Sequence, residues 1–185
     1  MNKNNLSVRE IQASDIDKLV QYWLGSDPVY LEGMGVDVKK LFTKEQFTNM
    51  LLTQLQLPYE QKNAYCIIWE LEGKAVGHCN TNPSQFGKEA NMHLHLWHSD
   101  SRKKGLGLSL LRMTIPYFFK NLQLKQLICE PYAFNPAPHK TLEKLGFIFE
   151  KEYVTIPGSI NFEQPVKRWV LSYDAYNKIY NEHLK

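Results

Sequence analysis

The sequence predicts an α/β domain built on one mixed, mostly antiparallel β-sheet flanked by helices. Some segments carry apolar residues at helical spacing, others alternate apolar and polar residues, and tight turns join neighbouring strands. The chain has 185 residues, of which 43% are apolar and 22% are charged. This length and composition are typical of one globular domain, residues 1–185, that buries a sizeable core.

The first third of the chain predicts one strand and two helices. Residues 6–12 have the pattern of a short strand, and apolar residues then recur at helical spacing over 16–24. Proline and glycine interrupt residues 26–42, which we expect to be irregular. Thr43 and Gln46 form a T-x-x-Q capping box, which predicts the start of the second helix.

The middle of the chain predicts three consecutive strands. Residues 64–71 are rich in β-branched and aromatic side chains, and a Glu-Gly turn leads into a returning strand over 74–80. Residues 81–90 have the composition of a loop. Residues 91–98 alternate strictly, so their odd-numbered and even-numbered side chains point to opposite faces of a sheet.

The second half of the chain alternates helices and strands. An apolar helix is predicted over 108–122, with Pro116 expected to kink or break it. A strand follows at 125–130 and a short helix at 139–145. Two further strands and a terminal helix complete the chain, at residues 147–156, 166–173 and 174–183.

The charge and cysteine content exclude several classes of protein. The net charge of +3, from 22 Lys and Arg against 19 Asp and Glu, is too small to predict nucleic acid or an anionic membrane as the main partner. No apolar run approaches the ~18 residues of a membrane span, and the N-terminus lacks a signal-peptide core. Cys66, Cys79 and Cys129 have no metal-binding spacing, which predicts free thiols in a reducing, cytoplasmic compartment and no metal site.

The sharpest local motif is the basic, glycine-containing turn RKKGLG between a strand and a helix. Glycine lets a ligand approach the backbone, and a helix N-terminus offers unpaired N–H groups to a phosphate. The alternative is a solvated basic turn whose glycine serves packing. The residues of this motif are Arg102, Lys103, Lys104, Gly105, Leu106 and Gly107.

A second motif, NPAPHKTLEKLGF, lies at residues 135–147. With both motifs, the sequence resembles the GNAT superfamily of N-acetyltransferases. The acetyl-CoA motif R/Q-x-x-G-x-G/A is matched at Arg102, Gly105 and Gly107, and the strand order matches along nearly the whole chain. The second motif is most similar to the branch that acetylates ribosomal-protein N-termini and small amines, although Pro138 replaces its usual serine.

The resemblance implies how acetyl-CoA is held. The strand that ends at Leu96 and Trp97 and the strand that ends near Glu130 should splay apart, and pantetheine would lie between them like an added strand. The pyrophosphate would bind the N–H groups of residues 103–107, and Asn135 would contact the pantetheine arm or the acceptor.

Transfer of an acetyl group to an amine needs a base, because a free alkylamine is mostly protonated at neutral pH. His93 and His95 share one face of the fourth strand and are candidate bases, and Glu130 is another. The alternatives are histidines that decorate the outer face or hydrogen-bond within a core, and a solvated strand-end carboxylate. The tyrosine that the family usually places after Asn135 as an acid is missing, so Tyr132 is the substitute candidate.

The resemblance places the acceptor site among residues 22–50 and 157–166. The irregular segment in the first of these ranges carries Asp27, Glu32 and Asp37 and no cation, which would attract a cationic amine. The alternative is an ordinary solvated acidic loop.

Three functions remain open at this stage. The first is an acetyl-CoA-dependent N-acetyltransferase that acts directly on a primary amine, with a homodimer left open. The second is a GNAT-fold module that binds acyl-CoA with little or no catalysis. The third is a phosphate-binding or nucleic-acid-binding domain that uses the basic turn, against which the low net charge speaks.

Overall fold

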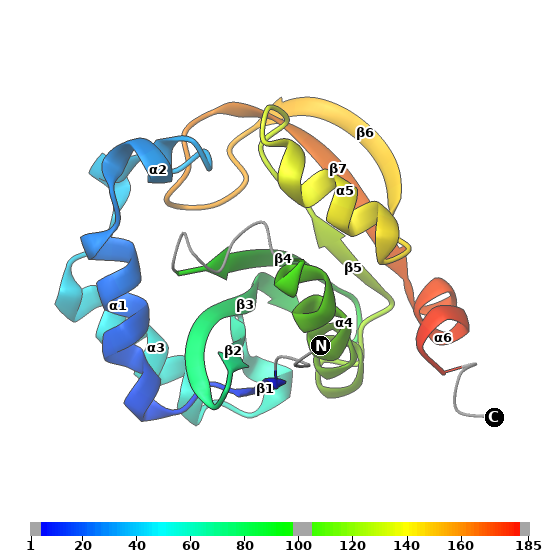
Figure 1. Cartoon of the computed structure of the whole chain (residues 1–185), viewed down its shortest axis with the longest axis horizontal. Helices are drawn as coiled ribbons and strands as arrows, with labels where there is room; N and C mark the ends of the chain where they lie inside the picture. The colour runs from blue at the N-terminus through cyan, green and yellow to red at the C-terminus, as the bar shows by residue number, and fades with distance from the viewer. Residues whose placement is uncertain (1–4, 98–104, 182–185) are drawn as a thin grey trace.

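The computed structural model describes residues 5–97 and 105–181, which form one seven-stranded sheet in the order β1-β2-β3-β4-β5-β7-β6 (Figure 1). The strands are β1 (Leu6–Glu10), β2 (Tyr65–Leu71), β3 (Lys74–Gln85), β4 (Glu89–Leu96), β5 (Gln126–Cys129), β6 (Ile148–Thr155) and β7 (Gln164–Ser172). The helices are α1 (Ile16–Gly25), α2 (Pro28–Glu32), α3 (Lys44–Gln56), α4 (Leu106–Asn121), α5 (Pro136–Lys144) and α6 (Tyr173–Asn181).

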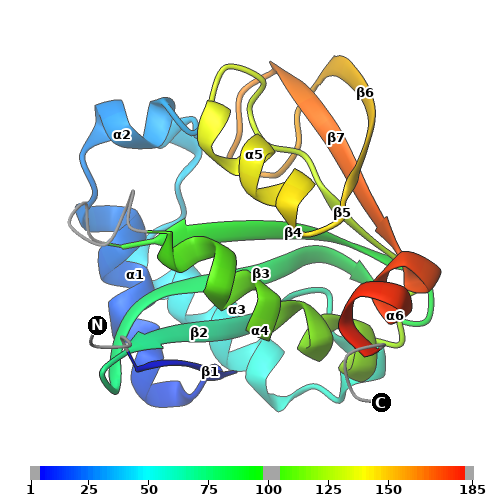
Figure 2. The same ribbon diagram turned by 45° about the vertical axis from the view of Figure 1, so that its right-hand side comes forward.

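The predicted fold class is confirmed. Every strand pair is antiparallel except β4 and β5, which are parallel and pair only from Glu89–Asn91 to Gln126–Ile128. Beyond that short ladder β4 continues to Leu96 while β5 diverges from it, so the central pair is splayed as expected. Figure 2 shows the two strands close together at one end and separated at the other.

Three sequence-based expectations differ from the structure. The predicted loop over 81–90 instead extends β3 to Gln85, with a bulge near Pro83 that accommodates proline within a strand. Residues 26–42 contain the short helix α2 and a 3-10 turn. Of the two effects expected of Pro116, the break is absent: helix α4 continues through it, because buried apolar side chains on both sides of the proline hold the helix against the sheet.

Other local signals behave as predicted. The capping box forms: the N–H of Gln46 donates to Oγ1 of Thr43 at 3.2 Å, and the N–H of Thr43 donates to the Gln46 side chain at 2.9 Å. All three cysteines are unpaired and buried. No helix in the described part of the chain has the length and apolar character needed to cross a membrane.

The two faces of the sheet are packed differently. Ile67 and Trp69 of β2 belong to a large apolar core that includes α4, whereas Cys66 and Ile68 point to the opposite face, toward α1 and α3. On that second face the buried residues form only two small clusters. The second face is therefore less completely filled, and the candidate site lies there.

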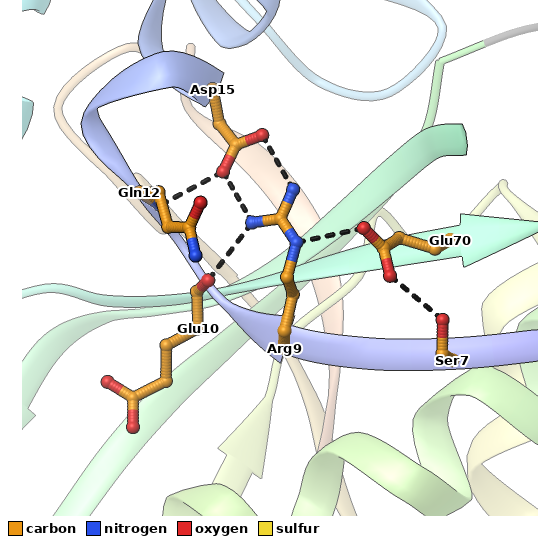
Figure 3. A network of polar contacts seen from close by, with 6 residues as sticks. All are labelled: Ser7, Arg9, Glu10, Gln12, Asp15 and Glu70. Carbon is orange, nitrogen blue, oxygen red and sulfur yellow. Dashed lines mark hydrogen bonds and ion pairs between the residues drawn. The ribbon is translucent and has the colours of Figure 1, made fainter. Parts of the chain in front are cut away.

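A partly buried ion-pair network fixes the start of α1 (Figure 3). Two guanidinium nitrogens of Arg9 donate to the Asp15 carboxylate at 2.6 and 2.9 Å, and its Nε donates to Glu70 at 2.8 Å. Ser7 completes the contacts of Glu70, and the N–H of Gln12 donates to Asp15. Because Asp15 immediately precedes α1, this network sets where the helix crosses the sheet.

Candidate active site

An opening in the backbone pairing lies at the centre of the sheet. Past Asn91, the partner of β4 among the described strands is β3 alone. The N–H of Trp97 donates to the Val76 carbonyl on β3 at 3.0 Å. Because backbone groups alternate in direction along a strand, the peptide groups of Leu94 face the β5 side instead. This edge can hold an extended ligand as an added strand.

The glycine turn, residues 105–107, lies where α4 begins. Gly105 has a φ of +72° and occupies the N-cap position, while buried Leu106 anchors the first turn to the core. A Cβ on Gly105 or Gly107 would meet no atom within 4 Å, and the first turn carries no acidic residue. The turn is therefore an open, positive helix end that fits a pyrophosphate. The predicted cations Arg102, Lys103 and Lys104 lie outside the described residues.

Three histidines meet on the opposite face of the same strands. His78 of β3 is the cross-strand partner of His95 of β4, and their rings stack with centroids 4.8 Å apart. The indole N–H of Trp97 donates to Nδ1 of His78 at 2.8 Å, so the His78 proton is on Nε2. Burial lowers the pKa of His78 to about 3, which keeps this ring neutral.

His93 has a different environment from the other two rings. Its Nε2 lies 2.8 Å from the carbonyl of Asn82, which can only accept, so Nε2 carries a proton and Nδ1 is the basic atom. Burial lowers the pKa of His93, but the bond to Asn82 and the charge of Glu130 oppose that change. For His95, burial and the neighbouring histidines all lower the pKa, to well below its ordinary value.

The remaining predicted acid–base residues are engaged elsewhere. The Glu130 carboxylate, 8% exposed, accepts hydrogen bonds from Tyr153 at 2.6 Å and from Arg168 at 2.9 Å. The Glu130 carboxylate is thus already engaged by donors from β6 and β7. Tyr132 lies beyond β5, where its ring packs edge-to-face on Phe162.

Three predicted cofactor contacts lie at element ends. Leu96 ends β4 and Trp97 follows it, and the Trp97 indole packs among the residues near α1 rather than on the α4 side. Asn135 is the N-cap of α5, and its side-chain carbonyl accepts from the Ala137 N–H at 3.4 Å. The Trp97 N–H is bonded to β3, so the backbone of Leu96 and the amide of Asn135 remain the candidate contacts.

A cavity of about 470 Å³ opens on the histidine face, between this face and helices α1 and α3; we call it the histidine cavity. His78, His93 and His95 line it together with Asn80 and Asn82 of β3. The opposite wall is apolar. It is formed chiefly by Trp23 of α1, by Phe42, and by Phe47, Met50, Leu51 and Leu55 of α3.

The hairpin loop between β6 and β7 roofs this cavity; the roof is residues 158–161. The Asp37 N–H donates to the Ile160 carbonyl at 2.8 Å. The carbonyl of Gly35 accepts from the side chains of both Asn161 and Gln164 at 2.8 Å. The roof is therefore tied to the segment between α2 and α3, in the two regions that the resemblance assigns to the acceptor site.

The three predicted acceptor-binding acids are not part of the cavity lining. Asp27 caps α2 by accepting from the N–H of Tyr30 at 3.1 Å. Asp37 caps the following 3-10 turn and lies 3.8 Å from the ammonium of Lys40. Glu32 is exposed at the end of α2. Two of these carboxylates are therefore used as helix caps.

Sequence reasoning missed the contribution of β3 to the site. His78, Asn80 and Asn82 are polar residues at every second position of one strand, which places them on one face. That alternation was visible in the sequence. Their meeting with His93 and His95 depends on the β3–β4 register, which aligns His78 with His95 and Asn80 with His93. Within the described residues no cluster of His, Cys, Asp or Glu is arranged to hold a metal ion.

Comparison by sequence identifies a family. Residues 5–148 match the model of the acetyltransferase (GNAT) domain. No curated protein matches the chain by sequence.

Solved structures share the fold at low sequence identity. RimL, a ribosomal L7/L12 α-N-protein acetyltransferase in complex with coenzyme A, has a TM-score of 0.75 at 14% identity, over 94% of this chain and 97% of that one. Ribosomal-protein-S5-alanine acetyltransferase from Vibrio fischeri has a TM-score of 0.75 at 21% identity, over 94% and 96%. Aminoglycoside acetyltransferase AAC(6')-Ib in complex with coenzyme A and kanamycin has a TM-score of 0.70 at 17% identity, over 94% and 98%.

Proposed function

The chain belongs to the GNAT acetyltransferase family, and on that basis we propose that it transfers the acetyl group of acetyl-CoA directly to a primary amine. The observation that carries this proposal is the opening beside β4. One face of that strand leads to the glycine turn of α4, and the other faces the histidine cavity. A ligand lying in the opening would therefore reach both the phosphate-binding helix end and a site with basic groups.

The residues available for the cofactor fit acetyl-CoA. The backbone N–H groups of Gly105, Leu106 and Gly107 would hold the pyrophosphate, with Arg102, Lys103 and Lys104 beside them in the sequence. The β4 edge at Leu94 and Leu96 would hold the pantetheine arm, with Asn135 on the other side and with Trp97, whose N–H is bonded to β3, at the end of that edge. Acetyl-CoA supplies an activated thioester.

The proposed chemistry is a direct acyl transfer. The amine nitrogen forms a bond to the thioester carbonyl carbon, the carbon–sulfur bond breaks, and the amine loses a proton. We assign that proton to Nδ1 of His93, since its Nε2 is held by the Asn82 carbonyl and its neighbours oppose the fall in pKa. His95 and Glu130 are the alternative acceptors, and Tyr132 remains the candidate acid.

The test is the release of free thiol from acetyl-CoA in the presence of a panel of primary amines. Native protein thiols should give little background, because burial raises the pKa of Cys66 and Cys79 and raises that of Cys129 to about 12. The buried thiols also fit the proposed cytoplasmic location. We expect amine-dependent thiol release that His93→Gln reduces at least tenfold.

The same experiment separates the second candidate function, an acyl-CoA-binding module without catalysis. That function predicts thermal stabilisation by acetyl-CoA with no thiol release for any amine. The proposal fails if acetyl-CoA binds and no member of the panel is acetylated.

A further inference from the structure

The histidine cavity has a composition that restricts which amines can occupy it. Aliphatic and aromatic side chains from α1 and α3 form one wall, and neutral imidazole and amide groups of β3 and β4 form the other. Trp23 stacks on Phe47 in that first wall, with centroids 6.3 Å apart, and meets His95 edge-to-face at 4.8 Å. The wall is thus continuous with the histidine cluster.

The lining carries two charged side chains of opposite sign, Glu10 and Lys62, and both already make hydrogen bonds. Glu10 accepts from the Tyr59 hydroxyl at 2.7 Å and from the Asn121 amide at 3.4 Å. The ammonium of Lys62 donates to the backbone carbonyls of Gln54 and Leu55. Burial lowers the pKa of Lys62 and the charge of Glu10 opposes that change, so the two groups act on one another and the lining has no net charge to hold a second ammonium.

From this lining we infer, resting on the proposed function, that the acceptor is a primary amine joined to one large apolar group. The amine would lie against His93, Asn80 and Asn82, and the apolar group would extend along Trp23 and Phe47. Polyamines and aminoglycosides would be poor acceptors, because their additional ammonium groups would be desolvated in a lining that has no net negative charge. The same chemistry is available in a free alkylamine or arylalkylamine and at a peptide N-terminus with a large apolar first residue.

The volume sets the size of the apolar group. A dry cavity of 150 Å³ is enough to bind benzene, so about 470 Å³ corresponds to roughly three times that space. Each buried methylene contributes about 0.8 kcal/mol, which is about fourfold in kcat/KM. We therefore expect kcat/KM to rise about fourfold per methylene from ethylamine through hexylamine and to level off when the cavity is full.

A matched pair of substrates gives the sharpest test. Hexylamine and 1,6-diaminohexane have the same chain, and the second differs by a terminal ammonium that would enter the apolar end. We expect kcat/KM for the diamine to be lower by at least about 100-fold. A peptide that begins with Leu, compared with one that begins with Asp, distinguishes a peptide source from a free amine. Equal or higher kcat/KM for the diamine, or for spermidine, would overturn the inference while leaving acetyl transfer itself intact.

Variants of α3 localise the effect. Leu51→Trp should fill the cavity and raise the KM for hexylamine at least tenfold, whereas Leu52→Trp, on the exposed side of the same helix, should leave it unchanged. Phe42→Ala enlarges the cavity and should move the optimum to longer chains. Thermal unfolding confirms that each variant is folded. Unaltered chain-length preference in both Leu51→Trp and Phe42→Ala would place the acceptor elsewhere.

A binding measurement separates the inference from the proposed function. We expect 4-phenylbutylamine to stabilise the CoA-loaded protein thermally, and Leu51→Trp to abolish that stabilisation. Binding without acetylation would support the inference and refute the transferase. Acetylation of polar amines without binding of 4-phenylbutylamine would do the reverse.

Discussion

Replacing Gly35 with alanine tests whether the roof of the histidine cavity is held by one buried side chain. Gly35 has a φ of +87°, and an added Cβ would lie 1.9 Å from Oε1 of Gln164. Gln164 is only 2% exposed, and its amide donates to the Gly35 carbonyl, so it cannot move aside without losing that bond. The substitution should therefore break the tie between the roof and the α2–α3 segment.

The magnitude follows from two contributions. An alanine in the left-handed region costs about 1–2 kcal/mol, and loss of a buried hydrogen bond costs about 1–3 kcal/mol more. Gly73 is a matched control, because its φ is +72° and an added Cβ there meets nothing within 4 Å. Gly35→Ala should thus destabilise the protein by about 1–3 kcal/mol more than Gly73→Ala. For a chain of this length that corresponds to an additional fall in Tm of roughly 2–12 °C.

Thermal unfolding and acetyl transfer give the two readouts. Gly35→Ala should raise the acceptor KM while the acetyl-CoA KM stays the same, and Gly73→Ala should change neither. In the double variant Gly35→Ala/Gln164→Ala the two losses should be less than additive, because the clashing side chain is gone. Equal losses of stability in Gly35→Ala and Gly73→Ala, or strict additivity in the double variant, would refute the reasoning.

Three other predictions concern the anchor of α1, the glycine turn and the base. Asp15→Asn should cost about 1–3 kcal/mol in urea unfolding. Burial opposes ionisation of Asp15, but its bonds from Arg9 and Gln12 lower its pKa in the native protein, so the native carboxylate stays charged where the carboxylate of the unfolded chain protonates. The loss should therefore be constant from pH 7 to 5 and shrink as the pH falls below about 4, the ordinary pKa of an unfolded Asp. Gly107→Glu should raise the free energy of unfolding by about 1 kcal/mol through helix propensity and the helix dipole, yet weaken acetyl-CoA binding at least tenfold in a thermal-shift titration. The control Gly107→Ala should stabilise the protein without weakening acetyl-CoA binding. Tight acetyl-CoA binding by the glutamate variant would contradict the pyrophosphate assignment. With wild-type enzyme, kcat should fall on the acid side only below about pH 6.5, because burial lowers the pKa of His93, and a profile unchanged in His93→Gln would exclude this base.

The sequence predicts the fold wherever local patterns and packing agree. Alternation along β4 correctly places His93 and His95 on one face, and the capping box at Thr43 correctly places the start of α3. Two elements run past prolines that were expected to interrupt them. Strand β3 continues past Pro83 through a bulge, and helix α4 continues through Pro116 because tertiary packing holds it. Local propensity is overridden in both places by interactions with distant residues.

The site is harder to predict from the sequence than the fold. Its residues are brought together by strand register, and which side chain pairs with which depends on residues far apart in the chain. Nothing local shows that Glu130 is paired with Arg168, 38 residues further along the chain. Similarly, the sequence predicts Asp27 as a free acidic group, whereas in the structure its carboxylate caps α2. A charged residue can be placed on the surface by its sequence, but whether its charge is available depends on contacts that the sequence does not display.

The uneven packing of the two sheet faces has a consequence for how this protein can diversify. The large core on the α4 side supports the glycine turn, whereas α1 and α3 pack in small clusters around the histidine cavity. Substitutions such as those at Met50 or Leu55 therefore reshape the cavity without entering the large core. A combinatorial library confined to α3 should yield new acceptor preferences at little cost to foldability, and changes of acceptor can accumulate there while the cofactor-binding half of the molecule is inherited intact.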